Sequence, residues 1–285
     1  MNTLKVCLTH DIDRTRKTYQ YLTRDIKSGK LSNLSTLVNG SQPYWQFEKM
    51  VELEEKYGAI STVFFLHETA PLEIFKPKRW QISLGRYSIN DPEIKGIIRW
   101  LDEKGWEVGV HGSYYSYKNL ELLQSEKHVL EDVLGHEVRG IRQHYMNLEE
   151  PLTWNLQKRA GFEYDSSLGR TDHSGYADHR IRPFTDPCSG MLVLPLTLME
   201  CYLFKEAGHN PRKALFIALS WMDHAQENGV PFTILWHQRM FNEKEFPGYR
   251  WVYEELLKEA CQREARFVTC RQLVDEFQEK VAINE

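Results

Sequence analysis

Short apolar runs of strand length alternate with helical patterns along almost all of the 285 residues. The runs are nearly uninterrupted and rich in β-branched and aromatic residues, which is typical of strands buried on both faces of a parallel sheet. This alternation predicts an α/β architecture in which helices cover the sheet. We expect strands at residues 5–9, 61–66, 107–110, 138–141, 191–196 and 232–236, with a short one near 267–268.

Helical patterns fill the intervals between these strands. They lie at residues 45–56, 92–104, 120–134, 152–160, 211–228, 251–263 and 270–281. The last has the clearest start, because Thr269 can cap it and Gln272 follows at the capping-box spacing. We interpret residues 14–44 as an irregular, partly helical insertion. The polar segment 169–190 is long for a connection in a compact domain, which indicates a functional loop.

The overall charge and composition argue against several classes of partner. A formal net charge of -4, without a basic run interleaved with aromatic residues, argues against a nucleic-acid or anionic-membrane surface. No stretch approaches the roughly 18 apolar residues of a membrane span. The five cysteines have no C-x-x-C spacing and the N-terminus lacks a secretory pattern. We therefore expect reduced thiols, a cytoplasmic location and a single domain over residues 1–285.

Ionisable side chains follow four of the predicted strands, at the point where each strand ends. In a parallel barrel these carboxyl ends share one face, where catalytic side chains collect. Such residues are costly to bury unpaired, so packing alone explains four successive placements poorly. We expect the residues to meet around one pocket. They are Asp11 and Asp13 after the first strand, His111, then Arg142 with His144 and Tyr145, and finally His237.

The two aspartates lie two residues apart, so in extended chain they point the same way. Paired carboxylates of this kind suit a metal ligand beside a catalytic base. Arg142 would keep Asp11 ionised, and His237 would suit a general acid. Each residue also has a purely structural interpretation. The aspartates are compatible with a loop or helix-cap pair, His111 and His237 with packed histidines, and Arg142 with a buried ion pair.

The order of these residues resembles the motif order of the polysaccharide deacetylases, also called NodB-homology or carbohydrate esterase family 4 proteins. Their first motif is a strand that ends in two aspartates, seen here as Thr9-His10-Asp11-Ile12-Asp13. The third, Arg-x-Pro-aromatic, corresponds to Arg142-Gln143-His144-Tyr145, and the fifth, a histidine at a strand end, to Trp236-His237. The resemblance covers nearly the whole chain and implies a distorted, incomplete (β/α)7-type barrel.

The resemblance also implies a role for each matched residue. Asp11 would be the catalytic base and Asp13 a metal ligand, with Arg142 orienting the base. The backbone N–H of Tyr145 would help to form an oxyanion hole. His237 would be the catalytic acid.

The second motif departs from the family pattern. Its usual form, His-Ser/Thr-x-x-His, provides two histidine ligands, whereas this chain has Tyr115 at the fifth position of His111-Gly112-Ser113-Tyr114-Tyr115. Catalytic zinc usually takes three protein ligands. We expect His144, which stands where the family has proline, to join Asp13 and His111 as the third. Lesser candidates are His67, His173 and Glu200.

The implied activity is the zinc-dependent removal of acetyl groups, N-acetyl above all, from a sugar. With a cytoplasmic location, the substrate would be an acetylated sugar, a nucleotide sugar or a lipid-linked oligosaccharide in surface-polysaccharide or lipopolysaccharide biosynthesis. Glu200 is also the candidate for the family's fourth motif, which supports the catalytic histidine. Expected substrate contacts are Tyr114, Tyr115, Glu200, Trp236 and Arg182.

Three other functions fit parts of the sequence. A metal-free, degenerate deacetylase would bind sugar without catalysis. Asp11-Ile12-Asp13-Arg14-Thr15 also fits the D-x-D-x-T signature of haloacid-dehalogenase-type phosphatases, with Asp11 as nucleophile and Asp13 as acid/base. That interpretation lacks the later acidic pair for magnesium and leaves His111, Arg142 and His237 unexplained. Hydrolysis of a non-sugar amide also stays open, because fold and metal do not fix the substrate.

Overall fold

A single sheet organises the molecule. The computed structural model describes residues 3–26, 29, 42–71, 73, 75–76 and 79–284. Within them a 10-stranded sheet runs in the order β6-β7-β5-β4-β3-β2-β1-β9-β8, and β10 pairs with β1 outside this path. All pairings are parallel except that of β6 with β7. The strands are β1 (Lys5–Ile12), β2 (Ser61–Leu66), β3 (Glu107–Gly112), β4 (Gly140–Gln143), β5 (Tyr164–Asp165), β6 (Phe184–Thr185), β7 (Leu192–Val193), β8 (Leu198–Met199), β9 (Phe232–Leu235) and β10 (Arg266–Phe267).

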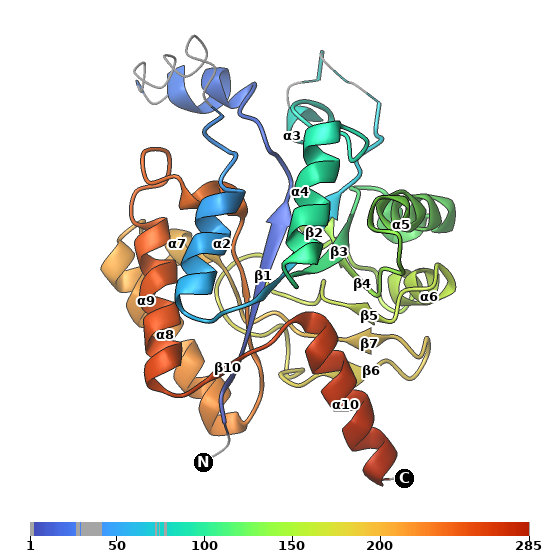
Figure 1. Cartoon of the computed structure of the whole chain (residues 1–285), viewed down its shortest axis with the longest axis vertical. Coiled ribbons are helices and arrows are strands. Elements are labelled where there is room, and N and C mark those ends of the chain that lie inside the picture. Colours follow the sequence, from blue (N-terminus) through green and yellow to red (C-terminus); the bar gives the residue numbers. More distant parts are fainter. Residues whose placement is uncertain are drawn as a thin grey trace.

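The sheet is an incomplete barrel, as the sequence predicts. Its order begins at β6 and ends at β8, and no strand pairing joins these two in the described ranges. Because neighbouring strands are parallel, their carboxyl ends lie at one edge, toward which the arrow of β1 points in Figure 1. The start of β1 and the end of the last helix lie at the opposite edge (Figure 1).

Helices flank the sheet on both sides, with α2, α7, α8 and α9 on one side of the view in Figure 1 and α4, α5 and α6 on the other. The sequence predicts all the long helices to within a few residues. The helices are α2 (Phe47–Lys56), α3 (Trp80–Ser83), α4 (Pro92–Glu103), α5 (Leu120–Leu134), α6 (Leu152–Arg159), α7 (Glu200–Glu206), α8 (Pro211–Asn228), α9 (Tyr249–Gln262) and α10 (Cys270–Asn284). Short 3-10 turns η4 (Ser116–Lys118), η5 (His144–Met146) and η6 (Gln238–Phe241) follow β3, β4 and β9.

Capping residues set the starts of these helices. Asp91 accepts a hydrogen bond from the backbone N–H of Glu93, and Pro92 occupies the first turn of α4. At α10 the predicted capping box is confirmed. The N–H of Gln272 donates to Thr269 Oγ1 at 3.3 Å, and the N–H of Thr269 donates to Gln272 Oε1 at 3.0 Å.

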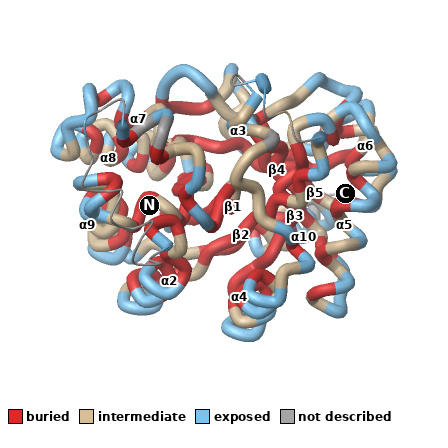
Figure 2. The backbone as a smooth tube through the Cα atoms, turned by 90° about the horizontal axis from the view of Figure 1, so that it is seen from above, coloured by how far each residue is buried: buried red, intermediate tan, exposed pale blue. Residues whose placement is uncertain are grey.

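The strands and the inner faces of the helices form the core, which Figure 2 shows as buried segments inside an exposed outer surface. A polar pair lies within it. His10 Nε2 is 2.7 Å from Glu54 Oε1, His10 Nδ1 is 2.5 Å from the carbonyl of Trp236, and neither His10 nor Glu54 is exposed to solvent. Glu54 also accepts hydrogen bonds from Trp106 Nε1 and Tyr253 Oη. His10 is therefore a structural residue, because both of its ring nitrogens already have partners.

Several short elements differ from the sequence prediction. The strands β5, β6 and β8 and the helix α7 were not expected, and β7 is two residues long where a six-residue strand, 191–196, was predicted. The segment 169–190 is not structureless, because it contains β6. Within the predicted insertion 14–44, a π-helix forms at Tyr21–Ile26, whereas residues 27–28 and 30–41 lie outside the described part of the chain.

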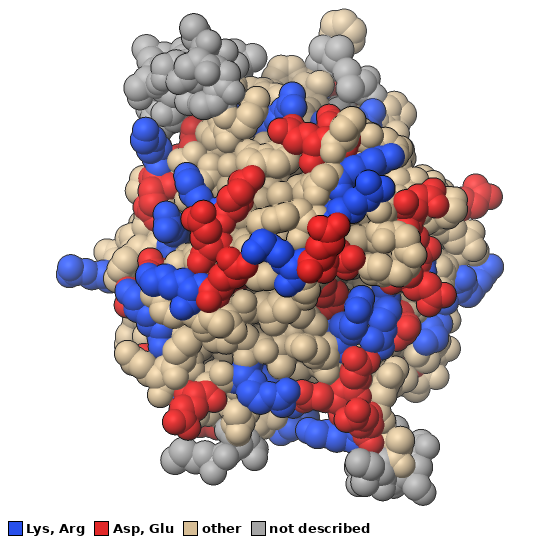
Figure 3. Space-filling model, in the orientation of Figure 1, with Lys and Arg blue, Asp and Glu red and all other residues tan. Residues whose placement is uncertain are grey.

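Charges of both signs are mixed on the face of the molecule in Figure 3. Lys and Arg alternate there with Asp and Glu, without a broad area of one sign. This face does not carry the basic stripe that a nucleic-acid backbone requires. A search of the described residues for a helix with the length and apolar character of a membrane span found none.

One buried acid makes stability depend on pH. Glu126 of α5 is 1% exposed, and its Oε2 accepts a hydrogen bond from the N–H of Ser113 at 3.3 Å. Burial raises the pKa of Glu126 from 4.5 to about 8, against the lowering effect of the Ser113 hydrogen bonds. The folded state therefore holds a proton that the unfolded chain releases near pH 4.5. Stability from this group is fully present below that pH and is lost as the pH rises toward 8.

Replacing Glu126 with glutamine is expected to remove the loss of stability that accompanies rising pH. Between about pH 4.5 and pH 8 the variant should gain on the order of 4 kcal/mol of stability relative to the native chain. Urea unfolding at a series of pH values measures this difference. The matched control is Glu121→Gln, at an exposed position of the same helix, which should follow the native curve. Parallel curves for Glu126→Gln and the native chain would contradict the assignment.

Candidate active site

The register of the sheet places three candidate site residues, Asp13, His111 and Arg142, at one level. His111 of β3 pairs with Leu66 of β2 and with Arg142 of β4. In the pairing of β1 with β2, Asp13 follows the last paired residue and is therefore level with Leu66. Residues at one level of a parallel sheet point to the same face, and Asp11 does so too because it precedes Asp13 by two.

These strand ends open into a cavity of about 320 Å³. The residues expected to meet around one pocket therefore do so, although they come from distant parts of the sequence. Six of them line the cavity directly, and Arg142 lies beneath it with no exposed surface. The lining residues are Asp11, Asp13, His111, His144, Tyr145 and His237.

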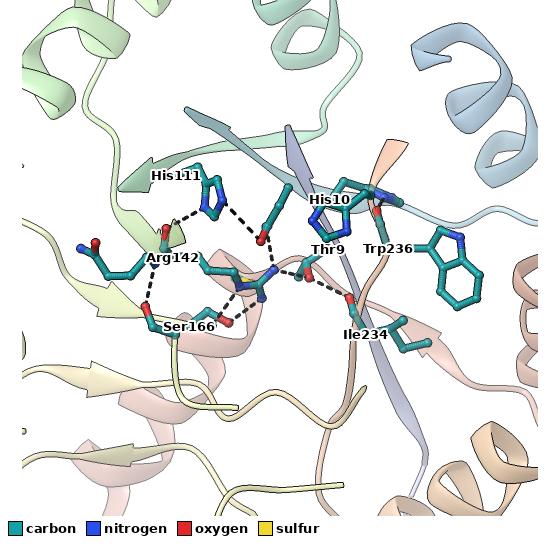
Figure 4. Close-up of polar contacts among 12 residues, drawn as sticks. Thr9, His10, His111, Arg142, Ser166, Ile234 and Trp236 are labelled. Carbon is teal, nitrogen blue, oxygen red and sulfur yellow. Dashed lines mark hydrogen bonds and ion pairs between the residues drawn. The ribbon is translucent and has the colours of Figure 1, made fainter. Parts of the chain in front are cut away.

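Arg142 holds Asp11 in place from the inside of the barrel. Its Nη1 donates to Asp11 Oδ1 at 3.1 Å and to Thr9 Oγ1 at 2.6 Å, while its Nε donates to the carbonyl of Ser166 at 2.9 Å. Figure 4 shows Arg142 and His111 converging on the same carboxylate. The other oxygen, Asp11 Oδ2, lies 3.8 Å from His111 Nε2. The arginine thus fixes one oxygen of the carboxylate, and the second lies toward the histidines.

Asp13, His111 and His144 form a cluster that could hold a metal ion, with ligand atoms that all lie within 4.8 Å of one another. Asp13 Oδ1 is 3.3 Å from His111 Nε2 and 3.6 Å from His144 Nε2. The second ring nitrogen of His111, Nδ1, lies 2.9 Å from the carbonyl of Arg142. Since a carbonyl only accepts, Nδ1 carries the proton and Nε2 keeps its lone pair for a ligand.

The protonation states of this cluster fit a divalent cation. Burial lowers the pKa of His144 to about 3, so its imidazole is neutral. Burial would raise the pKa of Asp13, but the positive charges of His237 and Arg239 hold it well below its usual range. Asp13 Oδ1 and His144 Nδ1 are both buried without a hydrogen-bond partner among the described residues. A cation beside Asp13 would satisfy the orphaned oxygen, so the donor set fits zinc.

His237 stands between two acids. Its Nδ1 lies 2.5 Å from Glu200 Oε1, and its Nε2 lies 3.3 Å from Asp13 Oδ2. Burial opposes the charged ring, but the fully buried Glu200 carboxylate and Asp13 together raise the pKa of His237 to about 10. Glu200 therefore orients the imidazole, which is the role expected for the fourth motif. The expected contact of Glu200 with substrate is wrong, because its side chain is buried beneath His237.

Arg239 belongs to this site although the sequence analysis did not select it. Its Nη1 donates to Asp13 Oδ2 at 2.8 Å, on the oxygen that does not face His111 and His144. Arg239 and His237 both contact Asp13 Oδ2. Asp13 Oδ1 therefore faces His111 and His144.

Tyr145 has an unusual backbone at the mouth of the cavity. Its φ is 60° and ψ 15°, in the left-handed region that residues other than glycine rarely adopt. Strain of this kind collects at functional sites. The centre of its ring lies 4.3 Å from that of His144 and 5.6 Å from that of Tyr114. The ring centres of Tyr114 and Tyr115 are 5.0 Å apart. Tyr114 is half-buried and supports the rim without lining the cavity.

Two expected substrate contacts lie away from the cavity. Trp236 has no exposed surface and packs among Phe204, Tyr249 and Tyr253. Figure 4 shows its indole pointing away from His111. Arg182 donates to the carbonyls of Asn228 and Gly229 at the end of α8. The prediction of a substrate contact is wrong for Trp236, because it is a core residue. For Arg182, which is exposed and bonds helix carbonyls, it stays a prediction.

The lesser metal candidates are not part of the cluster. His173 is exposed and lies 3.1 Å from Asp172, and His67 does not line the cavity. Glu200 contacts His237 rather than the cluster. Among the histidines offered as a third ligand, only His144 is brought to Asp13 and His111 in the described ranges.

No family model and no curated protein matches the sequence, but solved structures match the fold. A protein from Mycobacterium smegmatis, described as a polysaccharide deacetylase, is 17% identical with a TM-score of 0.65, covering 98% of this chain and 91% of that one. A Pseudomonas aeruginosa PAO1 protein of the same description is 16% identical with a TM-score of 0.62, covering 97% and 91%. The chain has the polysaccharide-deacetylase fold.

A further structural match shares this polysaccharide-deacetylase fold. The allantoinase Puue is 14% identical with a TM-score of 0.64, and the match covers 97% of this chain and 90% of that one. From the sequence pattern we expect Tyr115 to occupy the position of the motif's second histidine. Its side chain is 41% exposed and lines a separate small hollow with Arg79 and Ile82, so it takes no part in the cluster and does not contact the main cavity.

Proposed function

We propose that this chain is a metal-dependent hydrolase that removes acetyl groups, N-acetyl above all, from an acetylated sugar. The proposal rests on one observation. A carboxylate held by an arginine, an Asp-His-His cluster and a histidine held by a glutamate all border one cavity at the carboxyl ends of the strands. This set provides a base, a cation site and an acid, which amide hydrolysis requires.

Asp13, His111 and His144 would hold the ion. A divalent cation such as zinc supplies Lewis-acid activation of a carbonyl and of water. Asp13 would bind through Oδ1, because Arg239 occupies Oδ2 at 2.8 Å. Arg239 thereby keeps the carboxylate from turning.

The remaining steps belong to side chains around the cluster. Asp11, held by Arg142, would accept a proton from the attacking water. The N–H of Tyr145, presented by its left-handed backbone, would donate to the oxyanion of the tetrahedral intermediate. His237, oriented through Nδ1 by Glu200, would donate the proton at Nε2 to the leaving amine.

Removing the metal is expected to stop acetate release. Incubation with a chelator should lower the rate on an N-acetylated oligosaccharide to background, and added zinc should restore it. Coupled detection of acetate measures the rate across a panel with UDP-N-acetylglucosamine and an O-acetylated oligosaccharide. Acetate release that survives complete removal of metal would contradict the proposal.

The same assay separates the alternatives. A degenerate sugar-binding protein would bind members of the panel without acetate release, with or without zinc. A phosphatase would release phosphate from a generic phosphomonoester with magnesium. An amidase for other substrates would cleave non-sugar amides but not the panel. A cytoplasmic location and a role in surface-polysaccharide biosynthesis are part of the proposal, and cell fractionation together with polysaccharide analysis of a deletion strain tests them.

A further inference from the structure

The charges around the cavity do not balance. Its lining contains two carboxylates, Asp11 and Asp13, and each already has an arginine within ion-pair distance. Asp11 is paired with Arg142 at 3.1 Å and Asp13 with Arg239 at 2.8 Å. A third guanidinium, that of Arg14, also lines the cavity. The charged ring of His237 is balanced by Glu200. Three arginines against two carboxylates therefore leave one positive charge over before a metal ion is bound.

Of these three arginines, Arg14 is the one without an acidic partner among the described residues. Its residue is 9% exposed, and it donates from Nη2 to the carbonyl of Gln81 and from Nη1 to that of Leu84 at 2.5 Å. No ion pair joins it to a carboxylate in the described part of the chain. A guanidinium has five N–H donors, so three remain after these two bonds. A buried charge without a counter-ion is costly, and it marks a site where an anion would be stabilised.

The surroundings of Arg14 suit a ligand rather than the fold alone. The guanidinium lies 5.1 Å from the ring centre of Tyr19, another residue of the cavity lining. Arg239 and Tyr145 line the same cavity as Arg14. The two bonds to backbone carbonyls fix the guanidinium beside the cavity, which reduces the entropy that binding would cost.

We propose that Arg14 binds an anionic group, a phosphate or a carboxylate, carried by the acetylated sugar that enters this cavity. The inference rests on the proposed function and narrows its substrate to negatively charged sugars. A neutral sugar would leave the Arg14 charge uncompensated. Charge-assisted hydrogen bonds from a guanidinium to phosphate or carboxylate are among the strongest in proteins, so anionic substrates gain affinity here.

Matched ligands test the inference. Isothermal titration calorimetry compares N-acetylglucosamine with N-acetylglucosamine 1-phosphate and with N-acetylgalactosaminuronic acid, on the zinc-loaded full chain and again after chelation. We expect the charged ligands to bind on the order of tenfold to a hundredfold more tightly than the neutral sugar. The better of the two charged ligands identifies phosphate or carboxylate as the group recognised.

Two arginine variants locate the effect. Arg14→Gln should abolish the preference for charged ligands, whereas Arg16→Gln should retain it. Arg16 is a matched control because it lies two residues away with a 55% exposed side chain, paired with Glu93 at 3.0 Å. Both variants bind zinc, so a direct contact between the anion and the metal contributes equally to both affinities. The difference between the two affinities therefore measures the contribution of Arg14. Arg14→Lys, which keeps the charge, should retain most of the preference.

The outcomes are distinct from those of the acetate assay. Equal affinities of the native chain for neutral and charged sugars would overturn the inference even if Arg14→Gln failed to fold. A preference unchanged in a folded Arg14→Gln would overturn it as well. Charged sugars that bind through Arg14 without acetate release would retain the anion site and refute the hydrolase. Acetate release from neutral and charged sugars that bind with equal affinity would support the hydrolase and refute the anion site.

Discussion

Replacing His144 with alanine is expected to lower the affinity for zinc by on the order of a hundredfold or more. Loss of a group that only supports a metal ligand already lowers metal affinity by about tenfold to a hundredfold, and loss of a ligand should lower it further. His144 Nε2 lies 3.6 Å from Asp13 Oδ1, and its ring is neutral because burial lowers its pKa to about 3. Without it the cluster retains one carboxylate and one imidazole. Competition with a chromophoric chelator measures the affinity, and elemental analysis of the purified variant measures the bound zinc.

The control for this experiment removes a histidine elsewhere. His173→Ala, at an exposed position beside Asp172, should bind zinc as the native chain does. Tyr115→Phe should also leave zinc affinity unchanged, because Tyr115 lies outside the cluster. If His144→Ala retained native zinc content and affinity, the third ligand would have to be sought elsewhere and the proposed site would be wrong.

Replacing Asp11 with asparagine should lower kcat for acetate release by on the order of a hundredfold to ten-thousandfold, the usual contribution of a general base. Asparagine has the same shape, and its carbonyl oxygen can still accept the hydrogen bond that Arg142 makes to Asp11 Oδ1. The proton acceptor is lost while the packing is kept. Steady-state kinetics with zinc at saturation measures the change.

Asp13→Asn provides the comparison that separates base from ligand. That variant should lose zinc affinity and activity together, because Asp13 Oδ1 faces both histidines. Asp11→Asn should lose activity while zinc affinity stays within a few-fold of native. If Asp11→Asn released acetate at the native rate, Asp11 would not be the base, and if it lost its zinc, the two roles would need to be exchanged.

Much of the site could be predicted because residues that follow the strands of a parallel sheet gather at its carboxyl edge. Asp11, His111, Arg142 and His237 each follow an apolar run, and the parallel sheet gathers such positions at one edge. This pattern assigns a level on the sheet but not a direction for each side chain. Trp236 adjoins His237 in sequence, yet alternation along the strand turns it into the core.

Short elements and long-range contacts also limit what could be predicted from the sequence. The strands β5 and β8 have two residues each, too few for a periodic pattern to be recognised. They exist because neighbouring strands supply their hydrogen bonds. Likewise, nothing local to Arg182 predicts that it reaches the end of α8, or that Arg239 reaches Asp13. The single-domain expectation for residues 1–285 stays a prediction.

The alternation of His10 and Asp11 along β1 has a consequence for how faithfully the barrel assembles. A slip of one residue would exchange the two faces of the strand. The carboxylate of Asp11 would then be buried against Glu54, acid against acid, while the ring of His10 would meet the guanidinium of Arg142. Both mismatches penalise the shifted alignment. The carboxylate that we propose as the catalytic base therefore also favours the native register of β1.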